Sequence, residues 1–192
     1  VHTSLGTFHN LINFAVRVTK PIQRVALIKS ISGIRGTIGG KPGDNLTPVD
    51  VVKFTAAYGT LLKKKKGSIK VVIGRDARIS GELVNALVTS TLRSLGIDVI
   101  DLGLSTTPTV EIAVPLEKAS GGIILTASHN PPSYNGYKLK GIYGGPLIPE
   151  HVQEVEDIIP ATHGLDLPNI DLKKAKADGL IKDIDLETMY VD

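Results

Sequence analysis

A serine and a histidine stand side by side near the middle of this 192-residue chain, directly after a short apolar run. The run covers residues 121–125, and Ser128, His129 and Asn130 follow it ahead of two prolines. A serine hydroxyl beside an imidazole suggests covalent catalysis, in which the hydroxyl attacks the substrate. However, neighbouring residues of an extended chain point in opposite directions, and no Gly-x-Ser-x-Gly elbow surrounds Ser128. A serine esterase therefore fits the sequence poorly, and an ordinary loop serine and loop histidine are the simpler alternative.

Two further polar segments could supply charges beside this hydroxyl. Arg35 lies in a glycine-rich stretch, and Arg75, Asp76 and Arg78 follow a β-branched run. A guanidinium group offers a planar pair of donors that matches the oxygens of a phosphate. Taken singly, Arg75 and Asp76 could simply pair across a turn, and Lys138 could be a surface lysine. Together the segments predict a site for an anion, with phosphate as the best match.

Composition argues against several classes of function. The chain has no cysteine, so thiol catalysis, thiolate metal sites and disulfides are excluded, which fits a reducing compartment such as the cytoplasm. No run approaches the roughly 18 apolar residues of a membrane span. The net charge is only +3 and aromatic residues make up 4%, so neither a membrane nor a nucleic acid is expected as a partner. The glycine-rich stretch matches neither the dinucleotide fingerprint nor a Walker loop.

The elements that must position these groups alternate between strand and helix patterns. Strands are expected at 25–28, 69–74, 97–102 and 121–127, a short antiparallel edge strand at 137–140, and helices at 48–64, 80–95, 108–118 and 149–159. Thr47 and Ser80 are the expected N-caps of the first two helices, Gly96 is the expected stop of the second, and the glycine-rich stretch 32–40 is expected to be a loop.

Short buried strands separated by helices are typical of parallel βαβ units. The predicted fold class is therefore α/β, a three-layer α/β/α sandwich with a mostly parallel mixed sheet. In such a sheet, ligands bind outside the carboxyl ends of the strands. The segments that carry Arg35, Arg75 and Ser128 are all expected at that edge.

The chain divides into three parts by composition. Residues 1–24 contain no acidic residue, and we expect them to be an N-terminal extension outside the fold; a transit peptide, an upstream segment and a cloning remnant all fit. Residues 25–160 hold the alternating pattern of the domain. Residues 161–192 consist of short charged pieces and are expected to be a linker toward a second domain.

Four motifs resemble the α-D-phosphohexomutase family. The hexapeptide Thr-Ala-Ser-His-Asn-Pro at 126–131 and Asn-Gly-Tyr-Lys at 135–138 are similar to the family's active-site signature. Ser-Gly-Ile-Arg-Gly at 32–36 and Gly-Arg-Asp-Ala-Arg-Ile-Ser-Gly at 74–81 match it in the same order. The resemblance covers about residues 25–159 and implies the first domain of a phosphohexomutase.

The resemblance implies that a phosphoserine lends its phosphoryl group to a hexose phosphate, forms a hexose 1,6-bisphosphate, and takes a phosphoryl group back. It also implies Mg²⁺ bound to the phosphate of that serine. The residues that would carry these roles are Ser128 as the phosphoryl carrier and metal ligand through its phosphate; His129, Arg35 and Lys138 as catalytic neighbours; and Asn130, Arg75, Asp76 and Arg78 in the supporting loops.

Much of the family's machinery is absent from the sequence. The resemblance covers only the first of four domains, so domains II–IV, with the magnesium and sugar loops, would be partners, and the chain alone is expected to be inactive. The sugar stays open, because 30–47 resembles phosphoglucosamine mutases whereas 131–149 is more similar to phosphoglucomutases and phosphomannomutases. A truncated, non-catalytic phosphate-binding domain is a further alternative.

Overall fold

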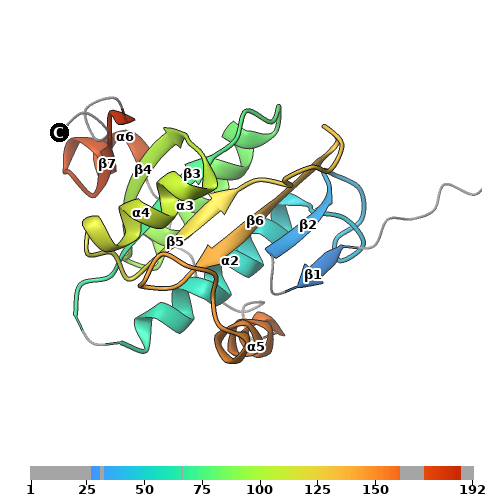
Figure 1. Cartoon of the computed structure of the whole chain (residues 1–192), viewed down its shortest axis with the longest axis horizontal. Helices are drawn as coiled ribbons and strands as arrows, with labels where there is room; N and C mark the ends of the chain where they lie inside the picture. Colours follow the sequence, from blue (N-terminus) through green and yellow to red (C-terminus); the bar gives the residue numbers. More distant parts are fainter. Residues whose placement is uncertain (1–26, 31–32, 66, 161–170, 187–192) are drawn as a thin grey trace, which may run out of the picture.

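The computed structural model of the chain describes residues 27–30, 33–65, 67–160 and 171–186 (Figure 1). Within these residues a seven-stranded sheet has the strand order β1-β2-β6-β5-β3-β4-β7. The strands are β1 (Ile28–Ser30), β2 (Gly33–Thr37), β3 (Lys70–Arg75), β4 (Asp98–Leu104), β5 (Gly121–Leu125), β6 (Tyr134–Lys140) and β7 (Ile181–Asp183). The helices are α2 (Pro48–Lys63), α3 (Gly81–Ser94), α4 (Thr107–Leu116), α5 (Pro149–Ile158) and α6 (Leu172–Ala177).

The sheet is mixed, as predicted, and its parallel strands occupy one side of it. β5, β3, β4 and β7 run parallel to one another, whereas β6 pairs antiparallel with β5, β2 with β6, and β1 with β2. No described helix is long and apolar enough to cross a membrane. The predicted α/β class and layered architecture are confirmed.

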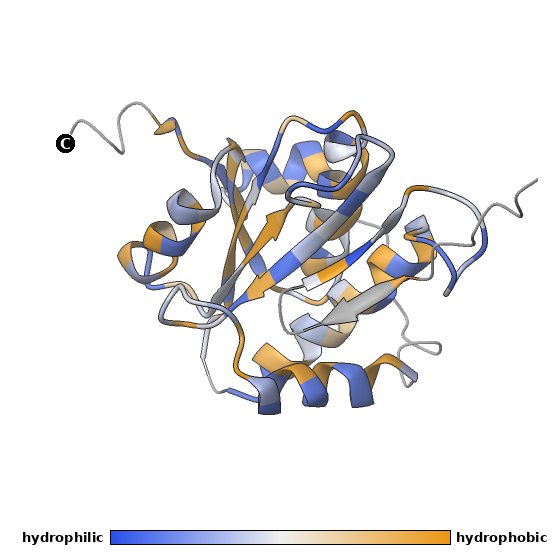
Figure 2. Cartoon of the chain, turned by 45° about the vertical axis from the view of Figure 1, so that its right-hand side comes forward, coloured by the Kyte–Doolittle hydropathy of each residue, from blue (hydrophilic) through white to orange (hydrophobic). Residues whose placement is uncertain are grey.

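Successive side chains of the central strands point to opposite faces of the sheet, and each face carries its own hydrophobic core. Ile73 and Ile123 belong to one buried cluster, which they share with residues of α2, α3 and α5. Val72 and Ile124 belong to the other, which they share with residues of α4. Hydrophobic colour is concentrated on the central strands, whereas α5 alternates between polar and apolar residues (Figure 2). Every residue of β5 is buried, so this strand is a fixed base for the loop that follows it.

Two of the three expected helix signals are confirmed. The Thr47 side chain accepts from the Asp50 amide, and the Asp50 carboxylate accepts from the Thr47 amide, which completes a capping box. Gly96 has a φ of +73° and ends the second helix in the left-handed region. The third is confirmed in position only: Ser80 is the N-cap residue of α3, but its side chain makes no capping hydrogen bond, and its hydroxyl instead accepts from the Asn135 side chain at 2.9 Å.

The glycine-rich stretch was wrongly expected to be a loop, because residues 33–37 form strand β2. A Cβ at Gly33, which has a φ of +125°, would lie 2.6 Å from the Tyr137 carbonyl oxygen, so glycine is required by the close approach of β6. The strand expected at 137–140 is β6, which begins three residues earlier, at Tyr134. It is not at the edge of the sheet, because β2 and β1 lie beyond it. The expected strand at 25–28 lies largely outside the described residues.

The segment 171–183 does not form the expected linker but joins the domain. α6 and β7 lie here, and β7 pairs in parallel with β4, with Ile181 opposite Val99. Ala175 and Ile181 are buried in the main core. The segment resembles a linker because most of its residues are polar and exposed, whereas its pairing with β4 and two buried side chains attach it to the domain. Residues 1–24, 161–170 and 187–192 lie outside the described residues.

Candidate active site

Three chemically active segments meet at the carboxyl edge of the sheet, where they were expected. Arg75 ends β3 and pairs with Leu125, the last residue of β5. The Thr126 amide then donates to the Gly136 carbonyl at 2.9 Å, and Gly136 in turn pairs with Arg35 on β2. The loop that begins at Thr126 therefore lies between β3 on one side and β6 on the other, with β2 beyond β6.

Ser128 is exposed on this loop in an uncommon backbone conformation. Its φ is +57°, in the left-handed region that costs a non-glycine residue about 1–2 kcal/mol. Its amide donates to the Thr126 hydroxyl at 2.8 Å, and that hydroxyl donates to the Asp76 carboxylate at 2.7 Å. Two consecutive hydrogen bonds, from the Ser128 amide to Thr126 and from Thr126 to Asp76, thus fix the backbone of Ser128. The Ser128 residue itself stays exposed to solvent.

Arg78 holds the rest of the loop. Its five guanidinium N–H groups donate to the carbonyls of Ser128 (2.8 Å), Asn130 (3.0 Å), Pro131 (2.8 Å) and Tyr134 (2.9 Å), and to Asp76 (3.1 Å). The Arg78 side chain is only 10% exposed. With its donors used in this way, Arg78 supports the loop and does not present them to an anion.

Arg75 also faces protein. Its guanidinium donates to the Glu82 carboxylate at 3.3 Å, and its side chain is 17% exposed. The side chain packs beside Gly81 at the start of α3. The structure therefore places the Arg75 guanidinium against the start of α3.

Arg35 and Lys138 share the opposite side of the loop. Arg35 pairs with Gly136, and residues two apart on one strand share a face, so Arg35 and Lys138 lie on the same face of β2 and β6. Burial lowers the pKa of Lys138, and the positive charges of Lys140 and Arg35 lower it further, although Glu111 opposes them. A lysine with a lowered pKa is better suited to proton transfer than an ordinary one.

Lys140 is held by α4 on the same face. Its side chain is 3% exposed, and its ammonium bonds Glu111 at 2.5 Å. An ion pair of this kind fixes β6 against α4, two residues from Lys138 on the same strand. This contact was not predicted from the sequence, because nothing in the spacing of residues 111 and 140 indicates it.

His129 and Asn130 differ in their surroundings. His129 is exposed beside Ser128, and no hydrogen bond of the described residues joins the two side chains. Asn130 donates its amide to the Ala127 carbonyl at 3.1 Å, and its buried side-chain oxygen has no partner within the described residues. Thr126 and Asn135 were missed as supporting residues; a hydroxyl two residues before Ser128 is the sequence signal that could have found Thr126.

The described residues do not form a metal site. They contain no group of three or more His, Asp or Glu side chains that could hold an ion. Asp76, the carboxylate that reaches the loop, already accepts from Arg78 and Thr126. The donor set near Ser128 therefore does not fit magnesium by itself, and a phosphate on Ser128 would add a single ligand.

Sequence relatives of this chain are sugar-phosphate mutases. A "Phosphoglucomutase/phosphomannomutase" of Thermococcus kodakarensis is 43% identical over 126 residues, which are 64% of this chain and 28% of the relative. A "Phosphoglucosamine mutase" of Halalkalibacterium halodurans is 38% identical over 141 residues, 70% of this chain and 31% of the relative. The chain thus spans less than a third of the length of these two relatives.

Structural similarity covers more of the chain. A solved phosphomannomutase-like protein of Thermus thermophilus superposes with a TM-score of 0.71 at 30% identity, over 86% of this chain and 34% of that one. The family profile described as phosphoglucomutase/phosphomannomutase, alpha/beta/alpha domain I, matches residues 27–164. Because that match spans most of the described sheet, including the loop of Ser128, the chain belongs to the domain I family of the phosphoglucomutases and phosphomannomutases.

Proposed function

We propose that this chain is the phosphoserine domain of a phosphohexomutase, with Ser128 as the phosphoryl carrier. The reactants would be a hexose 1-phosphate and a hexose 6-phosphate, interconverted through a hexose 1,6-bisphosphate. The observation that carries the proposal is the fixed, exposed position of Ser128 at the end of a fully buried strand. A covalent carrier needs such a position, because its oxygen must meet two different sugar oxygens in one geometry.

The proposed reaction is two exchanges at one oxygen. In the first, the bond from phosphorus to the Ser128 oxygen breaks and a bond from phosphorus to a sugar hydroxyl oxygen forms. The proton of that hydroxyl passes to the Ser128 oxygen. In the second, the bisphosphate presents its other phosphate, and Ser128 recovers a phosphoryl group with the reverse proton movement. No phosphate is consumed, so the net change is the position of the phosphate on the sugar.

Arg35 and Lys138 would stabilise the charge that moves. Both are cationic and lie on the face of β2 and β6 beside the loop. The lowered pKa of Lys138 supports a role in proton transfer to or from the bridging oxygens, whereas an arginine remains charged throughout. His129 would orient the phosphoryl group from the other side of Ser128.

Magnesium and the sugar would depend on further protein. A bound Mg²⁺ would supply positive charge to the phosphate of Ser128, and its remaining ligands would have to come from protein beyond the described residues. The relatives' greater length fits domains II–IV as partners in one site, and a cytoplasmic location agrees with the absence of cysteine.

Two alternatives stay open within this proposal. The sugar could be glucosamine phosphate, because a named phosphoglucosamine mutase is similar over a comparable length. A non-catalytic phosphate-binding domain would keep the fold but not the transfer. Competition between glucose, mannose and glucosamine phosphates in a turnover assay separates the sugars.

Phosphoryl transfer to Ser128 tests the proposal directly. The chain is incubated with glucose 1,6-bisphosphate labelled with ³²P, together with the segments that correspond to the remaining two thirds of a relative. The expected result is one phosphate on the peptide that contains Ser128, identified by mass spectrometry. Ser128→Ala is expected to remove the label.

Ser133 provides the matched control. It is an exposed serine on the same loop, and its backbone carbonyl accepts from the Ile38 amide. Ser133→Ala should keep full labelling, because only a backbone contact is involved. Label retained in Ser128→Ala, or lost in Ser133→Ala alone, would contradict the assignment, and a folded protein that never takes label would favour the non-catalytic alternative.

A further inference from the structure

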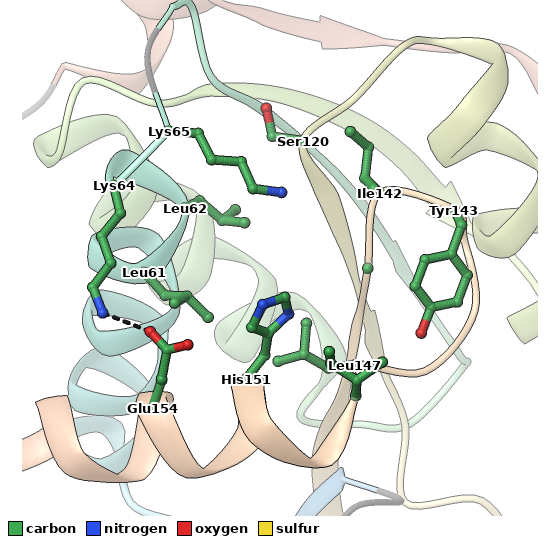
Figure 3. Close-up of a pocket in the computed structure, with 12 residues that line it drawn as sticks. Leu61, Leu62, Lys64, Lys65, Ser120, Ile142, Tyr143, Leu147, His151 and Glu154 are labelled. Carbon is green, nitrogen blue, oxygen red and sulfur yellow. Dashed lines mark hydrogen bonds and ion pairs between the residues drawn. The ribbon is translucent and has the colours of Figure 1, made fainter.

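A cavity of about 240 Å³ lies at the edge of the sheet opposite the Ser128 loop (Figure 3). It is bounded by the end of α2, the start of α5 and the turn that follows β6. Ser120, at its rim, precedes β5, whereas Thr126 follows that strand. Six residues at about 3.3 Å each separate the two ends by roughly 20 Å. The cavity is therefore remote from the proposed phosphoryl site.

The walls of the cavity are mostly apolar. Leu62 and Leu147, which are each 4% exposed, line the buried side. Ile142 and Tyr143 line the outer side and are more than half exposed, at 56% and 57%. Large apolar side chains that remain exposed around a concave space mark a binding surface more often than scattered ones do.

One positive charge at the cavity is not neutralised by a neighbouring carboxylate among the described residues. The Lys64 ammonium is neutralised by Glu154 at 2.6 Å. Lys65 has no ion pair among the described residues, and its ammonium extends into the cavity in Figure 3, as does the His151 ring. The space thus combines an apolar wall with one unneutralised cation and a hydrogen-bonding imidazole.

We propose that this cavity binds a small carboxylate with an apolar body, the carboxylate at Lys65 and His151 and the body against Leu62 and Leu147. The volume lies below the 300–1,000 Å³ of pockets for drug-sized ligands, so the ligand is small. A hexose phosphate does not suit the site, because its hydroxyl groups would lose water against leucine without gaining partners. A neutral apolar molecule would leave the Lys65 charge unmatched. This inference is independent of the proposed phosphoryl transfer.

Octanoate and octanol are matched probes of this proposal, since they share the alkyl chain and differ in charge. Titration into the ¹⁵N-labelled chain is followed by amide chemical shifts. Octanoate is expected to shift amides of the end of α2, of 141–147 and of the start of α5, and to bind at least tenfold more tightly than octanol. A charge-assisted contact of ordinary strength produces a difference of this size.

Lys65→Met isolates the charge, because methionine keeps an apolar stem and removes the ammonium. The variant should lose at least tenfold in octanoate affinity and keep its octanol affinity, whereas Lys173→Met, at an exposed lysine on α6, should change neither. Equal affinity of the two probes, shifts at the Ser128 loop instead, no octanoate binding, or an unaffected Lys65→Met would each overturn the proposal.

Discussion

Replacement of Arg78 is the sharpest test of how the Ser128 loop is held. Arg78→Met keeps the aliphatic stem and removes five hydrogen bonds, four of them to carbonyls of one loop. Removal of one partner from a buried charged contact costs about 3–5 kcal/mol. Several of these carbonyls lie on partly exposed residues and can regain hydrogen bonds to water. We therefore expect Arg78→Met to lower the free energy of unfolding by about 3 kcal/mol, the lower end of that range.

Two measurements separate local from global effects in Arg78→Met. Urea unfolding followed by circular dichroism gives the change in unfolding free energy. Hydrogen exchange of the Ser128 and Asn130 amides, which bond Thr126 and Ala127, reports opening of the loop. Both amides should exchange faster in the variant, even under conditions where the core of the sheet stays protected. Arg78→Lys should recover little, since an ammonium cannot reproduce the fork geometry.

Arg75→Met is the matched control for Arg78→Met. Arg75 makes a 3.3 Å contact to Glu82, whose side chain is 86% exposed, so its loss should cost no more than about 1 kcal/mol. Equal destabilisation by the two variants, or a loss below about 1 kcal/mol in Arg78→Met with unchanged amide exchange, would refute the role given to Arg78.

Three further outcomes follow from the same geometry. Ser128→Gly should be more stable than Ser128→Ala by about 1 kcal/mol, because only glycine adopts a φ of +57° without strain; equal urea midpoints would contradict this. Arg35→Met should raise the pKa of Lys138, measured by ¹³Cε titration, since the Arg35 charge lowers it; a constant or lower pKa would count against the shared face. Gly33→Ala should destabilise the fold by about 1–3 kcal/mol, and by more than Gly39→Ala, because a Cβ meets a carbonyl at 2.6 Å at position 33 and open space at position 39; equal effects would argue against the close approach.

The parallel strands β3, β4 and β5 were predictable because their signals are local. Runs such as 69–74 are β-branched and bounded by glycine, and the capping box at Thr47 lies within four residues. β2 and β7 were not predictable in this way. β2 is rich in glycine because the backbone of β6 approaches it closely at Gly33. β7 has only one buried residue, Ile181. Both strands therefore depend on pairing with strands that are distant in sequence.

The site shows the same division. The position of Ser128 followed from the end of a buried run, and the convergence of three segments followed from the general behaviour of α/β sheets. Residue type alone did not separate the arginines, because Arg35, Arg75 and Arg78 carry identical groups; it was the family resemblance that placed Arg35 beside Ser128 and the other two in supporting loops. Only the coordinates show that Arg78 turns toward loop carbonyls and Arg75 toward α3.

This separation of the arginines fixes the side from which an anion on Ser128 can be stabilised. Arg78 and Arg75 are engaged with protein on the β3 side of the loop. Arg35 and Lys138 lie on the β2–β6 side, on the same face of the sheet as Lys140, which α4 holds through Glu111. Under the proposed function, the cations that hold the loop can therefore be distinguished from those proposed to face the reaction: neutralising Arg78 should loosen the loop, whereas neutralising Arg35 should leave the loop intact and weaken phosphoryl transfer. A variant of Arg35 that opened the loop as Arg78→Met does would remove the distinction.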